Sequence, residues 1–346
     1  MSLVLTPNDN ARPPDVALYD REEIEARLRL FAEPDDFVAS PFSDSASSDQ
    51  LRRLRALLSD PRGPYRPTLS ATREMLCQLD ALCEDAPNLA TATHILSRSA
   101  RLSQLTSSPM IVRPILLVGA PGIGKTRVAK RCAAALGSAF AEYSFAQADD
   151  IGQLLGHSVA WRGAQIGLLT RTLISAPNAS PLILLDEIDK APQGHNGIPL
   201  DALHSMLEPA TAQYFVDPYL EIKVRADGVI WIATANDISA VKPSLLDRFV
   251  IVRVNPPTNA QEHHVIRAIY AEIIAHHASG FAADLTDDAL HIMRGHAPRV
   301  AKRVLEFALG FAAEDGRLAL SATDIVRAQR LASPPTRSEF GFHARR

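Results

Sequence analysis

A glycine-rich stretch near the middle of the chain has the residue types and the spacing that phosphate binding requires. Gly119-Ala120-Pro121-Gly122-Ile123-Gly124-Lys125-Thr126 fits the pattern G-x-x-x-x-G-K-[ST], directly after an apolar run and at the start of a predicted helix. Its glycines allow backbone N–H groups to surround phosphate oxygens, and Lys125 can reach the terminal phosphates. The Thr126 hydroxyl can ligate Mg²⁺. We therefore predict that residues 119–126 and the adjoining Arg127 bind a nucleotide together with Mg²⁺.

A second motif supplies the acidic groups that this chemistry needs. The apolar run Leu182-Ile183-Leu184-Leu185 ends in Asp186 and Glu187. A buried strand that ends in two acids can place one carboxylate beside the metal and the other beside the terminal phosphate. We assign Asp186 to the Mg²⁺ side and Glu187 to orienting and polarising the attacking water. The simpler alternative is an acidic strand end that faces solvent, and the nearby phosphate-loop motif argues against it.

The elements that must position these motifs follow the pattern of an α/β domain. Five short apolar runs alternate with amphipathic stretches of helical length, which is typical of strand–helix units on a parallel sheet. The runs span 115–118, 140–145, 182–185, 229–234 and 250–254. We predict a five-stranded parallel sheet flanked by helices, of the P-loop NTPase type, within residues 109–257.

Helical patterns flank this domain on both sides. Before it we predict a disordered leader over 1–18 and an N-terminal helical region over 19–108, with a loop at 34–49. After it we predict a helical lid over 258–332 and a tail over 333–346. In the lid, Thr286 and Ser321 are predicted N-caps, and Gly316 is predicted to end a helix. The predicted helices span 20–31, 49–59, 69–84, 88–105, 259–278, 286–294, 298–315 and 321–331.

Composition excludes several classes of function. The formal charge of −3, from 36 Lys+Arg against 39 Asp+Glu, gives no overall field that would attract nucleic acid or an anionic membrane. No window approaches 18 consecutive apolar residues, so we expect no transmembrane helix, and residues 1–15 do not resemble a secretory signal. The three cysteines lack metal-ligand spacing and indicate reduced thiols. We expect a cytoplasmic protein.

Several motifs together resemble the AAA+ ATPases, and most closely the ATPase module of Lon-type proteases. The resemblance covers about residues 110–305. It rests on the two motifs above, on Ala233-Thr234-Ala235-Asn236 closing a further apolar run, and on three longer stretches. These stretches are Gly156-His157 with Trp161-Arg162-Gly163-Ala164 and Gly167, then Leu182 to Lys190, then Leu203 to Asn236.

The resemblance implies roles for four further residues in ATP hydrolysis. Asn236 corresponds to sensor 1, which holds the attacking water. Arg248, in Pro243-Ser244-Leu245-Leu246-Asp247-Arg248, corresponds to the arginine finger that reaches the nucleotide of a neighbouring subunit. Arg299 corresponds to sensor 2, and Arg303, one helical turn later, is a rival for that role. A finger that acts on a neighbour implies a homo-oligomer, most simply a hexameric ring.

The resemblance also implies a pore loop of Trp161, Arg162 and Gly163 that grips a polypeptide. The family has an aliphatic residue where this chain has Arg162, and a partly buried interface role for Trp161 is the alternative. A hairpin is expected over Gln213 to Val224, with its aromatic residues either packed or directed into the pore. Only 14 residues follow the predicted lid, so we expect no peptidase domain in this chain.

These expectations define a leading function and two alternatives. The first is a stand-alone Lon-like ATPase that uses ATP and Mg²⁺ to remodel or translocate a protein partner. The second is a nucleotide-gated scaffold whose assembly state ATP sets, without threading. The third is a nucleic-acid-associated ATPase that acts through an arginine-rich stretch, against which a solvated helix face is the commoner explanation. That stretch contains Arg52, Arg53, Arg55, Arg62, Arg66 and Arg73. The doublets His263-His264 and His276-His277 are interpreted as surface residues.

Overall fold

The computed structural model describes residues 14–31, 44–191, 202–277 and 280–332. The predicted tail over 333–346 and most of the predicted leader lie outside these residues. The described chain divides into two compact units. The first combines Met1–Leu82, Thr91–Gly119 and Lys125–Arg253, and the second combines Cys83–Ala90, Ala120–Gly124 and Val254–Arg346.

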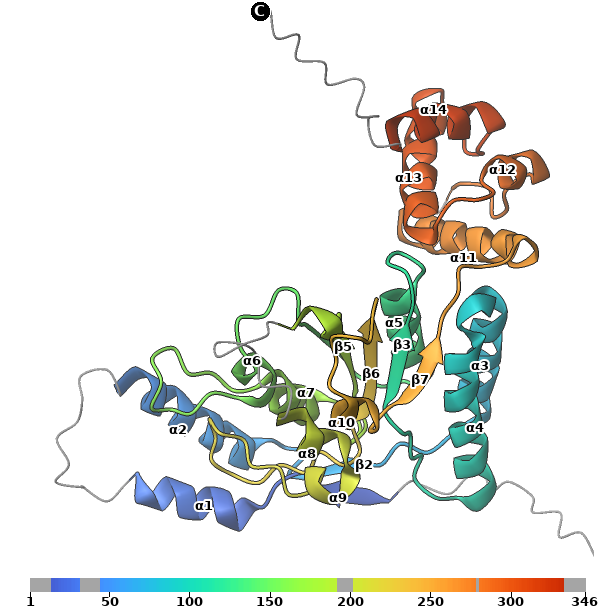
Figure 1. Cartoon of the computed structure of the whole chain (residues 1–346). Coiled ribbons are helices and arrows are strands. Elements are labelled where there is room, and N and C mark those ends of the chain that lie inside the picture. The colour runs from blue at the N-terminus through green and yellow to red at the C-terminus, as the bar shows by residue number, and fades with distance from the viewer. Residues whose placement is uncertain (1–13, 32–43, 192–201, 278–279, 333–346) are drawn as a thin grey trace, which may run out of the picture. The chain divides into compact units, whose positions relative to one another are not determined.

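The first unit is built on a parallel five-stranded sheet (Figure 1). Its strands are β3 (Ile115–Val118), β4 (Phe140–Ser144), β5 (Leu182–Asp186), β6 (Ile230–Ala235) and β7 (Val250–Arg253). The strand order is β4-β5-β6-β3-β7, and each neighbouring pair is parallel. Each strand lies within one residue of its predicted run, so the predicted fold class is confirmed. β3 and β6 are buried throughout, as expected for strands covered on both faces.

Helices and loops of the same unit cover this sheet. α5 (Lys125–Ala135) contacts β4, β5 and β6, and α7 (Leu168–Ser175) contacts β4. Both carry a buried apolar stripe that includes Val128 and Cys132 in α5 and Leu169 and Leu173 in α7. Four short helices lie in the connections: α6 (Gly152–Leu155), α8 (Leu203–Leu207), α9 (Pro209–Ala212) and α10 (Pro243–Leu246).

The N-terminal helices begin and end close to their predicted positions, with two corrections. The structure has α1 (Arg21–Leu30), α2 (Asp44–Ser59), α3 (Arg73–Asp85), a 3₁₀ turn (Pro87–Leu89) and α4 (Ala90–Thr106). The prediction of a loop over 34–49 is wrong for its last residues, because α2 starts at Asp44. Ser and Asp, which indicated a loop, are also the residues that helix starts prefer.

A second correction concerns the predicted leader. Asp15–Ala17 forms β1, which pairs antiparallel with β2 (Tyr65–Pro67) in a small two-stranded sheet. Strands of three residues give no alternating pattern long enough to recognise in sequence. Leu18, Ile24 and Leu54 belong to the same hydrophobic core as the strands of the large sheet. The segment after β1 and the helices α1 and α2 therefore contribute side chains to the core of the first unit.

The arginine-rich stretch is used within the protein. Arg52 and Arg53 pair with Asp49, and Arg62 pairs with Asp60. Arg66 is only 2% exposed, and its guanidinium donates to Asp60 and to the Ile174 carbonyl at the end of α7. Four of the six arginines in this stretch are therefore paired with an acidic side chain.

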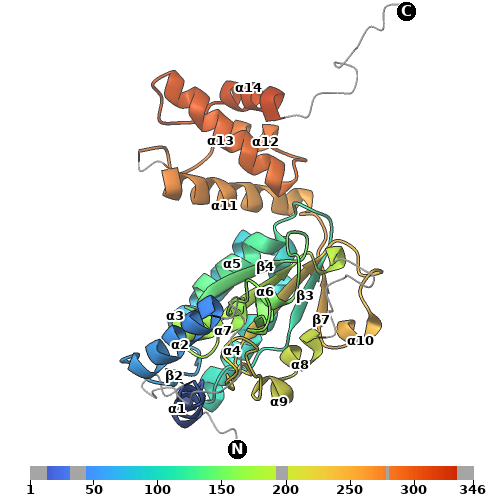
Figure 2. The ribbon, with the colours of Figure 1, turned by 90° about the vertical axis from the view of Figure 1, so that its left-hand side faces the viewer.

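The second unit contains a bundle of four helices (Figure 2). These are α11 (Asn259–His277), α12 (Asp287–Ile292), α13 (Pro298–Glu314) and α14 (Ala322–Ala332), and α13 contacts both α11 and α14. The predicted Thr286 cap is confirmed, because its hydroxyl accepts the Ala289 N–H at 3.3 Å. Gly316 follows α13 with φ +68°, as predicted for a residue that ends a helix. None of the described helices has both the length and the apolar character to cross a membrane.

The start of α14 holds a buried carboxylate on which this bundle depends. Asp324 is 1% exposed and accepts hydrogen bonds from the Ser321 N–H at 2.9 Å and from Arg317 at 2.8 Å. The Arg317 guanidinium outweighs the effect of burial and holds the pKa of Asp324 well below its usual range. The charged form is therefore favoured in the folded state, and the stability that it contributes is lost as the pH falls below the unfolded pKa of about 4.

We expect Asp324→Asn to lower the free energy of unfolding at pH 7 by about 2 kcal/mol, because Arg317 and the helix start lose their anionic partner. The difference from the wild type should shrink progressively as the pH falls below about 4, because the unfolded wild-type chain then binds a proton at this carboxylate while the folded protein, with its lowered pKa, does not. Denaturant titration of the full chain at both pH values measures this. Asp288→Asn, at an exposed acid in the first turn of α12, is the matched control and should change stability by less than about 0.5 kcal/mol. Equal effects of the two changes at pH 7 would contradict the assignment.

Candidate active site

The ammonium group of Lys125 lies at the carboxyl edge of the large sheet. Lys125 is the first residue of α5 and is 7% exposed. Its Nζ donates to the Gly119 carbonyl at 2.6 Å and to Asn236 Oδ1 at 3.0 Å. The register of β3 and β6 aligns Val118 with Ala235, so the residues that follow both strands meet at this edge. The structure thus brings together Lys125 and Asn236, which were predicted from separate motifs.

Asp186, at the end of β5, connects the predicted metal ligands. The Thr126 hydroxyl donates to its carboxylate at 3.1 Å, and the Thr234 hydroxyl donates to the same oxygen at 2.5 Å. Carboxylate and hydroxyl oxygens are the hard donors that Mg²⁺ prefers, and Mg²⁺ usually takes only one or two protein ligands beside water and phosphate. Thr126 and Asp186 therefore fit a Mg²⁺ ion that is shared with a bound nucleotide.

No other metal site is evident in the described part of the chain. Residues 14–31, 44–191, 202–277 and 280–332 contain no group of three or more His, Cys, Asp and Glu side chains that could hold a metal ion.

Glu187 has an unusual backbone conformation at the point where β5 ends. Its φ of +55° lies in the left-handed region, which costs a residue with a side chain about 1 kcal/mol. Its N–H donates to the Thr234 hydroxyl at 2.9 Å, and a short 3₁₀ turn (Ile188–Lys190) follows directly. Asp186 is the last residue of β5, whereas the backbone changes direction at Glu187. The two neighbouring acids therefore occupy different places, as their different predicted roles require.

Thr234 is a site residue that the sequence reasoning did not single out. It is 1% exposed in β6, and its hydroxyl both donates to Asp186 and accepts from the Glu187 backbone. One hydroxyl therefore orients the predicted metal ligand and holds the strained turn of the predicted base. The signal in the sequence was the polar Thr234 inside an otherwise apolar run, which had been read only as part of a motif.

We expect Thr234→Val, which keeps the shape and removes both hydrogen bonds, to lower kcat by about 10- to 100-fold, a typical effect of losing a group that orients a metal ligand. Thr234→Ser should retain most of the activity, because it keeps the hydroxyl. Steady-state ATP hydrolysis with both variants tests this. A valine variant as active as the serine variant would show that the hydroxyl has no role.

The second unit contains the remainder of the phosphate loop, residues 120–124, together with Arg299. Gly122 has φ +79°, and a Cβ added to it would lie 3.3 Å from Arg299 Cβ. The Arg299 N–H donates to the Gly122 carbonyl at 3.2 Å. Arg303 is engaged elsewhere, because its guanidinium donates to the Ala332 carbonyl at the end of α14. Of the two rivals, Arg299 is the one that lies against the phosphate loop.

Asn88 also contacts this loop, and the sequence reasoning had missed it. Its side-chain amide donates to the carbonyls of Ile123 and Asn255, each at 3.4 Å. It lies in the 3₁₀ turn between α3 and α4, where one Asn among many polar residues gives no distinguishing signal.

Arg248, the predicted finger, lies just after α10 and is 38% exposed. Within the same chain its guanidinium donates to the Glu208 carboxylate, which is 44% exposed. This contact is at the surface, so a neighbouring chain can compete for the arginine at little cost.

The predicted pore loop projects from the first unit with Trp161 at its tip. The Trp161 side chain is 68% exposed, and Arg162 and Gly163 are exposed beside it. The Trp161 N–H donates to Ser158, and its carbonyl accepts the Ala164 N–H at 3.1 Å, so the tip is a pair of tight turns. The indole at this tip therefore offers a large apolar face and one N–H donor to solvent.

The predicted hairpin over 213–224 is confirmed only in part. The two sides of the segment pair through an isolated antiparallel bridge between Val216 and Lys223 and do not form regular strands. Phe215 and Tyr219 are packed, at 8% and 1% exposed, whereas Tyr214 is 66% exposed. Two of the three aromatic residues therefore pack the segment, and the third faces outward.

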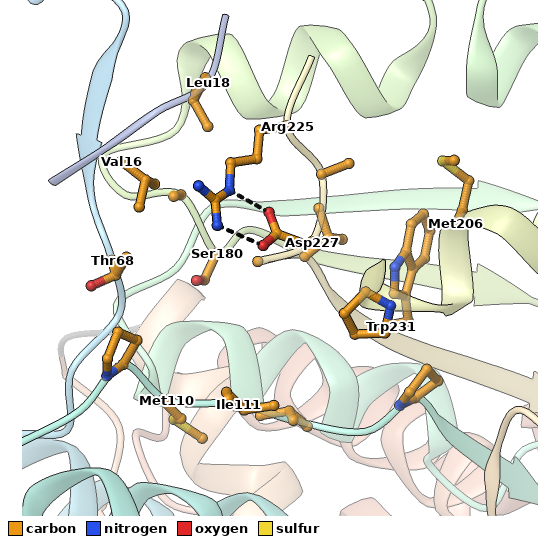
Figure 3. A pocket seen from close by; sticks show the side chains of 18 of the residues that line it. Val16, Leu18, Thr68, Met110, Ile111, Ser180, Met206, Arg225, Asp227 and Trp231 are labelled. Carbon is orange, nitrogen blue, oxygen red and sulfur yellow. Dashed lines mark hydrogen bonds and ion pairs between the residues drawn. The ribbon is translucent and has the colours of Figure 1, made fainter. Parts of the chain in front are cut away.

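A separate cavity of about 310 Å³ lies at the opposite edge of the sheet (Figure 3). Ser180, Gly228 and Pro114, which line it, precede β5, β6 and β3, whereas the residues above follow these strands. Its walls are mainly apolar, and its charged groups neutralise each other, because Arg225 and Asp227 form two hydrogen bonds at 2.7 and 2.9 Å. This cavity is not part of the candidate active site.

Comparisons with known proteins agree with this geometry. Residues 115–256 match the family described as "ATPase family associated with various cellular activities (AAA)". The chain is 34% identical to a mitochondrial Lon protease homologue of Ostreococcus lucimarinus over 190 residues, 54% of this chain and 20% of that protein. It is 36% identical to a Lon protease of Salinispora arenicola over 153 residues, 44% of this chain and 20% of that protein.

The likeness is limited in extent. The match spans about a fifth of the length of these curated relatives. Among solved structures, the RuvB Holliday junction branch migration motor of Thermotoga maritima is similar, with a TM-score of 0.47 and 15% identity over 70% of this chain and 68% of that chain.

Proposed function

We propose that this chain, which matches the AAA family over residues 115–256 and is similar to a Lon protease homologue over 54% of its length, is an ATPase that remodels or translocates a protein partner. The observation that carries the ATPase proposal is the convergence of Lys125, Thr126, Asp186 and Asn236 at one edge of the sheet. These residues fit ATP with Mg²⁺. They offer an ammonium group for the phosphates and a hydroxyl and a carboxylate for the metal, all at one edge of the sheet.

In the proposed mechanism the chain binds phosphates and prepares water. Lys125 exchanges its contacts with Gly119 and Asn236 for the terminal phosphates, which frees the Asn236 amide to hold the attacking water. Glu187 accepts a proton from this water as it attacks. Thr126 and Asp186 hold the Mg²⁺, which supplies charge neutralisation on the phosphate oxygens when bound.

Two arginines complete the proposed site. Arg299 lies against the phosphate loop of its own chain and acts as sensor 2 on the terminal phosphate. Arg248 leaves Glu208 and stabilises the charge on the transferring phosphoryl group of a neighbouring chain. This requires a homo-oligomer, and a hexameric ring is the proposed form.

Trp161 connects ATP turnover with the proposed action on a partner. The exposed indole offers a large apolar surface for gripping an unfolded polypeptide, and Arg162 beside it favours acidic or polar stretches. The exposed tip of the loop is the observation that supports this role over that of a scaffold.

We expect Trp161→Ala to retain basal ATP turnover within about two-fold and to abolish its stimulation by an unfolded protein, because the Trp161 side chain is exposed and its backbone bonds only residues of its own loop among those described. Tyr214→Ala, at a similarly exposed aromatic residue, is the matched control and should retain stimulation. Trp161→Ala with unchanged stimulation would favour the nucleotide-gated scaffold instead.

A further inference from the structure

A buried carboxylate that ATP hydrolysis does not use lies beneath the Trp161 loop. Asp217 is fully buried, and its Oδ1 accepts the N–H groups of Tyr219 and Leu220 at 2.9 and 2.8 Å. Its Oδ2 accepts the Thr170 hydroxyl at 2.5 Å. Burial raises the pKa of this carboxyl, and the hydrogen bonds from Thr170, Leu220, Tyr219 and the Gly167 backbone oppose the rise. A buried carboxylate is stable only when such donors surround it. The hydrogen bonds therefore hold Asp217 and its donors in fixed positions relative to one another.

The residues that Asp217 contacts form the neck of the loop. Residues 157–166 connect Gly156 with Gly167, and the His157 N–H donates to the Gln165 carbonyl at 3.1 Å across the base. Val159, Ala164 and Ile166 of this loop pack against the core, whereas Trp161 at its tip is exposed. Gly156 has φ +107°, and a Cβ added there would lie 3.3 Å from Asp217 Oδ2. A Cβ added to Gly167 would lie 2.5 Å from the Gly156 nitrogen. The two sides of the neck therefore touch, and the Asp217 carboxylate lies against them.

The same carboxylate connects this neck to α7, which begins at the next residue. Thr170 lies in the first turn of α7 and is fully buried. At the other end of α7, Arg62 and Arg66 both donate to the Ile174 carbonyl at 3.0 Å. The helix is thus held at both ends, and Asp217 is the group that joins its first turn to the neck of the loop.

We propose that Asp217 is a positioning residue that locks the neck of the 157–166 loop onto α7 and thereby presents Trp161 in one orientation for gripping a polypeptide. The gripping role rests on the proposed function, whereas the anchoring of the loop does not. Within the described residues, the hydrogen bonds of the Asp217 and Thr170 side chains go to residues outside the candidate active site, so loosening the neck should leave ATP hydrolysis intact. The loss should appear only in the coupling to a polypeptide.

Trp161 itself reports on the anchoring. The chain has two tryptophans, so a Trp231→Phe background leaves Trp161 as the single emitter. In this background Thr170→Val removes the hydrogen bond to Asp217, and Thr170→Ser keeps it. Thr172→Val is a matched control, because Thr172 lies on the same helix, is 7% exposed and donates its hydroxyl to the Leu168 carbonyl of that helix. Asp217→Asn is a second test variant, which removes the charge at nearly constant shape.

The first readout is nanosecond depolarisation of Trp161 fluorescence in the full-length protein. Thr170→Val and Asp217→Asn should increase the amplitude of fast local motion about two-fold or more, and Thr170→Ser and Thr172→Val should match the parent. If both Thr170→Val and Asp217→Asn kept the parent's depolarisation, the anchoring role would be overturned. If Asp217→Asn fails to fold, the comparison of Thr170→Val with Thr170→Ser still tests the anchoring role.

The second readout is ATP turnover with and without reduced, carboxymethylated α-lactalbumin as an unfolded probe. Thr170→Val should keep basal turnover within about two-fold of the parent. The increase in turnover caused by the unfolded probe should be at least about five-fold smaller than in the parent. Full stimulation despite a mobile Trp161 would overturn the link between the anchor and the grip. If the parent itself shows no stimulation while Thr170→Val mobilises Trp161, the proposed function fails and the anchor stands.

Discussion

Replacing Glu187 by glutamine should leave ATP binding intact and slow hydrolysis by about 10²- to 10⁴-fold, the range that general bases contribute. Glutamine has nearly the same shape and the same tolerance of the left-handed backbone, and it cannot accept a proton from water. The Glu187 N–H bond to Thr234 is a main-chain contact and remains. Fluorescent-nucleotide titration measures the binding, and phosphate release measures the rate.

Glu142→Gln is the matched control for this experiment. Glu142 is an exposed carboxylate on β4 of the same sheet and pairs with Lys130. Its change should leave the rate within about two-fold of the wild type, since surface ion pairs contribute little. A Glu187→Gln protein that hydrolyses ATP at the control rate would remove Glu187 from the mechanism.

Arg248→Ala should reduce ATP turnover about 10³-fold, the lower end of what an arginine finger contributes. The proposal further predicts that this loss can be repaired by a second inactive variant. Lys125→Ala protein lacks a working phosphate site and keeps its finger, whereas Arg248→Ala protein keeps its phosphate site and lacks the finger. Mixed oligomers of the two contain interfaces at which an intact site faces an intact finger.

An equal mixture with random assembly should recover about a quarter of the wild-type turnover, because each of the two neighbours at an interface has an even chance of being the right variant. Arg253→Ala, at an exposed arginine ending β7, is the matched control and should be active without mixing. No recovery in mixtures that demonstrably exchange subunits would exclude action on a neighbour. Full activity of Arg248→Ala alone would exclude the finger altogether.

The sheet and the residues at its carboxyl edge could be predicted because several independent patterns agree there. Fully buried strands give continuous apolar runs, and the phosphate loop needs its lysine and glycines at fixed spacing. These patterns predict one site for Lys125, Thr126 and Asp186, and the structure places all three at the same edge of the sheet. Asn236 and Arg299 required the resemblance to a family, since a strand-end Asn or an arginine near a helix start is common without a function.

Other features depend on tertiary contacts that local sequence patterns do not reveal. β1 and β2 are three residues each and form only because distant segments pair, which local periodicity cannot reveal. Thr234 acts through a hydroxyl that two other motifs share, so its importance appears only when β5 and β6 lie side by side. Arg66 looked like part of a basic surface and is instead buried against Asp60 and the end of α7. In each case tertiary contacts decided what the residue does.

The central claim is that ATP turnover is coupled to an unfolded polypeptide. Steady-state ATP hydrolysis by the purified protein, with and without reduced, carboxymethylated α-lactalbumin and beside a Lys125→Ala control, tests it most directly. We predict turnover that rises with the unfolded polypeptide and vanishes in the control. Slow turnover that is indifferent to the polypeptide would contradict a remodelling motor and favour the nucleotide-gated scaffold, and turnover that persists in Lys125→Ala would contradict the site itself.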